Sequence, residues 1–168
     1  KRDWSSDVCS SDLSFTAPDL LTKAIQWCKR DLKFPYVFLT TNGSLATPAR
    51  LRAVMSAGLD SLKFSMNAAD DEQFESVMGV KAKLLNQAIF NLKSARIVRE
   101  ELGASCGIYA SSIKYDGEQQ NKMQDFLADH VLPYVDEHYW LPLYSMGSLA
   151  TQREQELGYR PTRSEEHT

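Results

Sequence analysis

Polar and apolar side chains alternate strictly between residues 61 and 67, a pattern that predicts a β-strand with two different faces. One face carries large apolar side chains, and the other carries four polar ones: Ser61, Lys63, Ser65 and Asn67. Hydroxyl and carboxamide groups both donate and accept hydrogen bonds, so this face suits a polar ligand. A polar face is typical of a strand whose inner side lines a wet or ligand-filled barrel. An antiparallel strand with one solvated face would show the same alternation.

A second group of candidate residues follows the apolar and aromatic run at residues 36–39, which predicts a buried strand. Thr41, Asn42 and Gly43 end that run with turn-forming residues, and Gly43 can adopt the positive φ that alanine avoids. Residues 47–58 then have helical spacing, with proline at the first helical position and glycine just beyond the last. This helix leads into the alternating strand, so a parallel arrangement places both groups at the same rim.

The three cysteines, Cys9, Cys28 and Cys106, are too few and too widely spaced for a disulfide framework or a metal site. Cys28 lies on the apolar face of a predicted helix and Cys106 in a predicted strand, so both are expected to be small core residues. The chain also lacks a P-loop, an HExxH motif, a nucleophile elbow and a Cys-x-x-Cys pair. No metal ligand is therefore predicted in this chain, and no catalytic residue is identified.

Two further residues have side chains that can do chemistry. His138 stands next to Glu137, which suggests acid–base work, but no second member of a constellation is evident, and this favours a structural or surface role. Tyr109 shares the small or polar face of a predicted strand at 105–113. There it would contact a ligand or satisfy its hydroxyl inside a barrel.

The elements that position these residues alternate between helix and strand. Helical spacing and apolar runs predict helices at 17–32, 70–79, 84–102 and 118–131 and strands at 105–113 and 137–143. We therefore expect an α/β fold, a fragment of a partial TIM-like (β/α) barrel whose four parallel strands have their helices on the convex side. The charged residues at 96–101 are expected to form a solvated helix face.

Composition narrows the classes of function. The 168 residues fit one domain, and 43% hydrophobic with 24% charged residues supports a packed core. A net charge of −3 argues against a nucleic-acid partner. No apolar run approaches a membrane span and no signal peptide is visible, so we expect a cytoplasmic protein that does not bind membranes.

The two ends of the chain do not resemble natural protein sequence. Residues 1–13 and 163–168 resemble translated sequencing adapter, and we expect them to be disordered tails. The natural part is then an internal fragment, with a core at 14–148 and a linker at 149–162.

The segment TTNGSLATPARLRAVMSAGLDSLKFSMNA, together with the sequence up to about residue 148, resembles the third and fourth strand units of radical S-adenosylmethionine (SAM) enzymes. The T-N-G after one strand and the AGxDSxxxS run into the next are similar to the branch that carries a C-terminal SPASM domain. The resemblance implies a parent enzyme that reductively cleaves SAM at a [4Fe–4S] cluster. The resulting 5′-deoxyadenosyl radical abstracts hydrogen from a substrate, which the sequence leaves open between a peptide and a small metabolite.

The resemblance also assigns roles to residues. Ser65 and Asn67 match the end of the family's fourth strand, where polar side chains meet the SAM ribose hydroxyls, and Thr41, Asn42 and Gly43 match the neighbouring loop. The family's CxxxCxxC cluster loop and its Gly-Gly-Glu run are absent from this chain, so the cluster ligands would lie upstream in the parent. The fragment alone is therefore expected to be inactive.

Two alternatives remain open at this point. Another (β/α) barrel enzyme, such as a lyase, would need a Schiff-base lysine or a metal ligand set, and Lys63 is the one candidate base on the polar face. A non-catalytic, flavodoxin-like binding domain would have strands that are apolar on both faces, and the polar faces at 61–67 and 105–111 argue against it.

Overall fold

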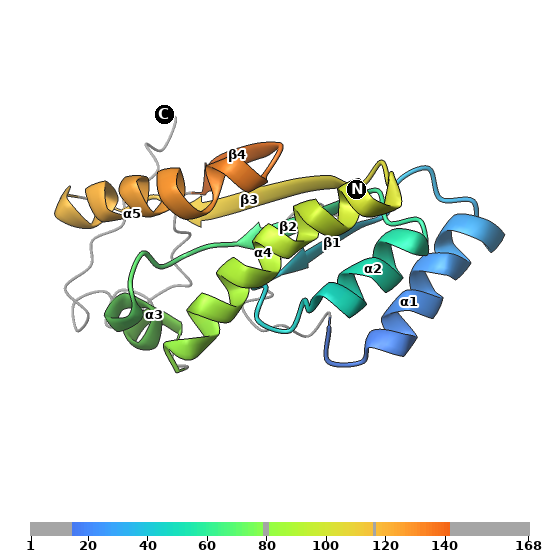
Figure 1. Ribbon diagram of the computed structural model, residues 1–168, viewed down its shortest axis with the longest axis horizontal. Coiled ribbons are helices and arrows are strands. Elements are labelled where there is room, and N and C mark those ends of the chain that lie inside the picture. Colours follow the sequence, from blue (N-terminus) through green and yellow to red (C-terminus); the bar gives the residue numbers. More distant parts are fainter. Residues whose placement is uncertain (1–14, 79–80, 116, 142–168) are drawn as a thin grey trace, which may run out of the picture.

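Four parallel strands form a single sheet in the order β1-β2-β3-β4, in a computed structural model that describes residues 15–78, 81–115 and 117–141 (Figure 1). The strands are β1 (Phe38–Thr41), β2 (Ser61–Ser65), β3 (Gly107–Ile113) and β4 (Glu137–Leu141). The predicted α/β class and the four parallel neighbours are confirmed, with strand bounds that differ by about two residues. The expectations for residues 1–13, 149–162 and 163–168 lie outside the described residues.

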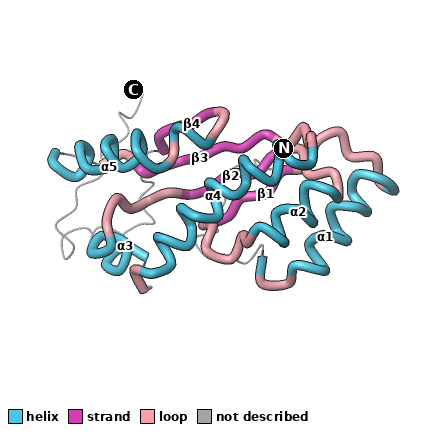
Figure 2. The backbone as a smooth tube through the Cα atoms, in the orientation of Figure 1, coloured by secondary structure: helices cyan, strands magenta, loops and turns pink. Residues whose placement is uncertain are grey.

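Helices cover one face of the sheet, as the barrel interpretation requires. Figures 1 and 2 show α2 and α4 lying across the same face, with α1 outside α2. Parallel neighbouring strands joined through helices on one face are the arrangement of β-α-β crossover units. The helical elements are α1 (Pro18–Gln26), η2 (Trp27–Asp31), α2 (Pro48–Ser56), α3 (Asp71–Met78), α4 (Lys83–Leu102), α5 (Gly117–His130) and η3 (Leu132–Tyr134).

The hydrophobic core lies between the sheet and these helices. Leu62, Phe64 and Ile108 point from the strands into it and are fully buried, as is Leu92 of α4. Burying one such side chain contributes roughly 1.5–3 kcal/mol. Cys106 is also buried, which confirms its predicted role as a core residue.

The core prediction for Cys28 is wrong, because the helix that carries it changes its period. Residues Trp27–Asp31 form a π-helical segment, in which the N–H of Leu32 donates to the carbonyl of Trp27. This wider turn shifts the apolar stripe predicted with 3.6 residues per turn. Cys28 is only half-buried and Leu32 is exposed.

The strand β1 lies at one edge of the sheet and carries an exposed apolar side chain. Phe38 is 56% exposed, so β1 is not the buried strand that its composition predicts. Within the described residues, β1 pairs only with β2. Exposed apolar side chains continue back along the chain from this edge: Trp27, Leu32, Phe34 and Tyr36.

Two aspartates clamp the N-terminal end of the sheet in the same way. Asp60, just before β2, accepts from the N–H of Val37 at 2.6 Å and pairs with Lys29 at 2.8 Å. Asp136, just before β4, accepts from the N–H of Ile108 at 2.7 Å and pairs with Arg99 at 2.5 Å. Each carboxylate thus ties a neighbouring strand to a basic residue of a helical segment. Arg99 is therefore an anchored residue rather than part of a solvated face.

We expect Asp60→Asn to lower the free energy of unfolding by about 1–2 kcal/mol, because it removes a charge-assisted hydrogen bond and a partly buried ion pair. Burial opposes ionisation of Asp60, but the Lys29 and Val37 hydrogen bonds outweigh it, and the pKa lies below its usual value. A lowered pKa stabilises the fold above the unfolded pKa of about 3.9 and loses that effect as pH falls through the folded value. Urea unfolding should therefore show a difference from wild type that is constant above about pH 5 and shrinks below about pH 4.

Asp125→Asn is the matched control, since Asp125 is exposed on α5 and forms no described ion pair. It should leave the unfolding free energy within about 0.5 kcal/mol of wild type. An Asp60→Asn difference that grows on acidification would contradict the clamp.

Candidate functional site

The parallel register brings the polar residues of all four strands onto one face. Residues paired across parallel strands point to the same side, so Lys63 shares a row with Thr40, Tyr109 and Glu137, and Ser65 shares the next row with Ser111 and Tyr139. We call the face opposite α2 and α4 the inner face. Its side chains come from Phe38, Thr40, Ser61, Lys63, Ser65, Tyr109, Ser111, Ile113, Glu137, Tyr139 and Leu141.

Two tyrosines close the inner face at the N-terminal end of the sheet. The Tyr36 hydroxyl lies 2.7 Å from the Ser61 hydroxyl. The Tyr109 ring folds back over Gly107, where an added Cβ would lie 2.7 Å from Tyr109 Cε2. Tyr109 is therefore directed away from the rim at which the strands end. The rows toward the C-terminal ends of the strands are the part of the inner face that corresponds to barrel active sites.

Ser65, Asn67 and Ser111 form the polar rim of the inner face. Ser65 and Ser111 are paired across β2 and β3, and Asn67 follows two residues after Ser65. Asn67 Oδ1 and Ser111 Oγ are buried and have no hydrogen-bond partner within the described part of the chain. Buried polar atoms are nearly always satisfied, so two orphans at one rim are unusual and mark it as a candidate polar site. Their hydroxyl and carboxamide groups can donate to and accept from polar groups such as the hydroxyls of a ribose.

Sequence reasoning missed the residue that holds Asn67. The Tyr115 hydroxyl donates to the Asn67 backbone carbonyl at 2.8 Å and joins the ends of β2 and β3. The burial of Tyr115 beside the polar end of β2 is the one sign of this structural role, and only the folded structure shows it.

The predicted loop at residues 41–43 lies at the same rim, but its side chains are used within the loop. Thr41 is 1% exposed, shares the helix-facing side with Phe64, and accepts from the N–H of Gly43 at 3.0 Å. Asn42 Oδ1 accepts from the N–H and the hydroxyl of Ser44, each at 3.0 Å. These hydrogen bonds fix the conformation of the loop at the rim. Cofactor binding by Thr41, Asn42 and Gly43 stays a prediction.

Asn91 of α4 supports this loop from the helix side. It is fully buried, and its Nδ2 donates to the carbonyls of Gly43 at 2.7 Å and Ser44 at 3.2 Å. Gln87 donates in turn to Asn91 Oδ1 at 3.1 Å. In the sequence, Asn91 stands next to the apolar stripe of α4, but a count of apolar residues at helical spacing does not include an asparagine.

His138 lies on the helix-facing side of β4, so the sheet separates it from the inner face. Its Nε2 is 3.1 Å from the Ser112 hydroxyl, and its ring meets Trp140 edge-on at 5.0 Å. Burial lowers the pKa of His138, which favours the neutral ring. These contacts support the structural interpretation of this residue.

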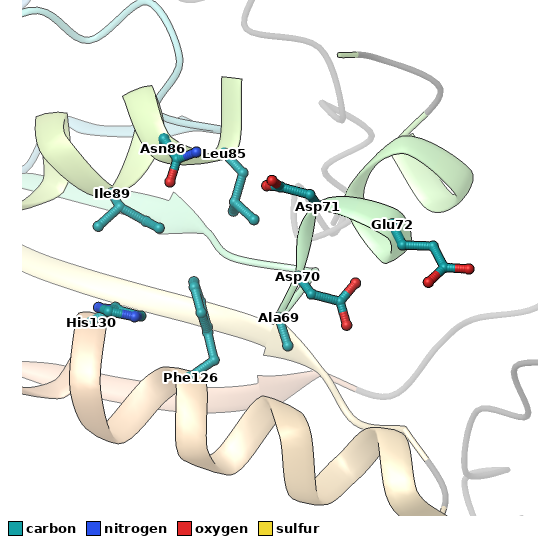
Figure 3. A pocket seen from close by; sticks show the side chains of 9 residues that line it. All are labelled: Ala69, Asp70, Asp71, Glu72, Leu85, Asn86, Ile89, Phe126 and His130. Carbon is teal, nitrogen blue, oxygen red and sulfur yellow. The ribbon is translucent and has the colours of Figure 1, made fainter. Parts of the chain in front are cut away.

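A cavity of about 480 Å³ opens on the helix side, behind the segment that follows Asn67 (Figure 3). Its acidic wall is partly committed to structure, since Asp70 accepts from the N–H of Gln73 at 2.7 Å and lies 3.8 Å from Lys122. Figure 3 shows His130 and Phe126 of α5 facing α4 across it. The lining residues are Ala69, Asp70, Asp71, Glu72, Leu85, Asn86, Ile89, Phe126 and His130.

The described residues do not fit a [4Fe–4S] cluster, which needs closely spaced thiolates. Burial raises the pKa of Cys106 to about 12, so its thiol stays protonated. Cys28 lies elsewhere, on η2. Across the described ranges, no three His, Cys, Asp or Glu side chains are grouped to hold a metal ion. None of the described helices is long and apolar enough to span a membrane.

Comparison with known proteins gives a likeness in structure only. No protein-family model matches the chain, and no curated protein matches it. Among solved structures, the chain is similar to a domain of pyruvate-formate lyase-activating enzyme from Bacteroides vulgatus ATCC 8482, with a TM-score of 0.57 and 16% sequence identity. The match covers 88% of this chain and 89% of that domain. At this identity the likeness shows a shared α/β fold.

Proposed function

We propose that this chain is part of the barrel of a radical SAM enzyme and that its inner rim holds the SAM ribose. The observation that carries the proposal is the pair of unpartnered buried atoms, Asn67 Oδ1 and Ser111 Oγ, beside Ser65 at the ends of β2 and β3. The similar solved domain comes from a pyruvate-formate lyase-activating enzyme, and this likeness in fold supports the proposal.

In this proposal the chain's own residues bind and orient the cofactor. Ser65, Asn67 and Ser111 offer hydroxyl and carboxamide groups that can donate to and accept from ribose hydroxyls. Tyr115 and Asn91 fix the two segments that carry the rim. SAM bound at a reduced [4Fe–4S] cluster supplies a 5′-deoxyadenosyl radical for hydrogen abstraction. The cluster ligands belong to a part of the parent protein outside this chain.

We further propose that the parent belongs to the SPASM-containing branch and works in the cytoplasm. The T-N-G and AGxDSxxxS segments support the branch. The exposed apolar edge at β1 fits docking of further βα units, and the adapter-like ends fit an internal fragment. A barrel lyase is less well supported. Lys63 lies over a tyrosine ring and, among the described residues, forms no ion pair with an acidic side chain.

Recovering the reading frame that surrounds this sequence in its source DNA tests the proposal. We expect a CxxxCxxC motif upstream of residue 14, within the two βα units that the barrel still needs, about 60 residues in all. The fragment itself, reconstituted anaerobically with iron and sulfide, should form no stoichiometric cluster. A cluster of one [4Fe–4S] per chain on the fragment, or an upstream frame without the motif, would count against it.

A further inference from the structure

Lys63 is a cation on the inner face that has no anionic partner among the described residues. The side chain is half-buried, and its ammonium lies 5.9 Å from the centroid of the Tyr139 ring. Within the described residues it forms no ion pair. The basic side chains that do form one are Lys29, Arg52, Arg96, Arg99 and Lys122. A partly desolvated charge without a counter-ion is unfavourable, so this position suits a ligand that brings a negative charge.

The rows of the inner face show from which side such a ligand would come. Tyr36 and Tyr109 close the N-terminal end below Lys63. Ser65 lies two residues further toward the rim, about 7 Å at the rise of a strand. A group that reaches Lys63 therefore lies below the proposed ribose position and on the same face.

The surroundings of Lys63 limit the charge and shape of that group. One ammonium matches one negative charge, and Glu137 on the same row would oppose a second. The Tyr139 ring, on the adjacent row, offers an apolar flank. Dianionic phosphate is often held by a bidentate arginine, and the described inner face has no arginine at this depth.

We propose that Lys63 and Tyr139 form a subsite for the carboxylate of a small ligand with an apolar or aromatic body. Calling this ligand the enzyme's substrate rests on the proposed function; the subsite itself does not. Lys63 donates to the carboxylate, and Tyr139 packs beside the body of the ligand. The pair sets which end of the ligand faces the rim.

Benzoate and its neutral isostere benzamide test the subsite on the 168-residue chain. Titrations are followed by NMR through the Lys63 ¹³Cε and Tyr139 ring resonances. A fragment of nine heavy atoms at ordinary ligand efficiency binds with a Kd on the order of 10 mM. We expect saturable shifts with benzoate and none with benzamide. Lys63→Met should abolish the Tyr139 response, and Lys63→Arg should keep it.

Lys93→Met is the matched control, because the Lys93 ammonium lies 5.1 Å from the Tyr134 ring centroid in the same kind of contact away from the inner face. It should leave the benzoate response at Tyr139 unchanged. No saturable benzoate shift, an equal benzamide shift, or a response unchanged by Lys63→Met would overturn the proposal. Benzoate binding at Lys63 in a parent protein that fails to bind SAM would keep the subsite and reject the radical SAM function.

Discussion

Gly43→Ala should lower the free energy of unfolding by about 2–5 kcal/mol, the largest loss we expect from a single methyl group in this chain. Gly43 has a φ of +83°, where an L-residue is strained by roughly 1–2 kcal/mol. Its new Cβ would also lie 2.9 Å from Phe64 Cδ1 and 3.2 Å from Ala88 Cβ. Both neighbours are buried, so overpacking adds about 1–3 kcal/mol. Urea unfolding measures the loss.

Gly103→Ala separates the two contributions. Gly103 ends α4 with a φ of +58°, but an added Cβ there meets no atom within 4 Å. It should cost only the conformational strain, about 1 kcal/mol. Equal losses at Gly43 and Gly103 would show that the loop at residues 41–43 is not packed against Phe64 as described.

Ser65→Ala with Asn67→Ala should weaken SAM binding to the full-length parent roughly 30- to 100-fold. Each substitution removes one neutral hydrogen-bonding group, worth about 1–1.5 kcal/mol, and 1.4 kcal/mol is a factor of ten in affinity. The fold should survive, because the Tyr115 bond goes to the backbone carbonyl of Asn67. Calorimetric titration with SAM measures the change.

The cluster spectrum is the internal check on this double variant, and Ser56→Ala, on the exposed side of α2, is the matched control. Both proteins should show unchanged cluster absorbance, and the control should bind SAM normally. A lost cluster with normal SAM affinity would overturn the role given to Ser65 and Asn67.

The fold was largely predictable because its signals are local. The alternation of Leu62, Phe64 and Met66 with polar residues fixed both β2 and its faces, and Gly103 marked the end of α4. The predictions of burial failed where the helix departs from 3.6 residues per turn and where a strand lies at the edge of the sheet. The π-helical segment after Gln26 moved Cys28 out of the core, and the position of β1 at the edge exposed Phe38.

The candidate site was only partly predictable because its geometry depends on distant segments. Ser65 and Asn67 could be found from strand alternation and resemblance. The orphaned Ser111 hydroxyl and the support from Asn91 and Tyr115 depend on register between strands and on helix packing. Thr41 matches the family's loop at the rim in the sequence, yet its pairing with Phe64 directs its side chain toward the helices.

The most direct test of the central claim is the cleavage of SAM by the full-length protein of the parent gene. After anaerobic reconstitution and reduction, we expect 5′-deoxyadenosine to form together with [4Fe–4S] absorbance, and to fall in the Ser65→Ala, Asn67→Ala variant while the absorbance stays. A reduced protein that carries no such cluster and forms no 5′-deoxyadenosine from SAM would contradict the assignment of this chain to a radical SAM barrel.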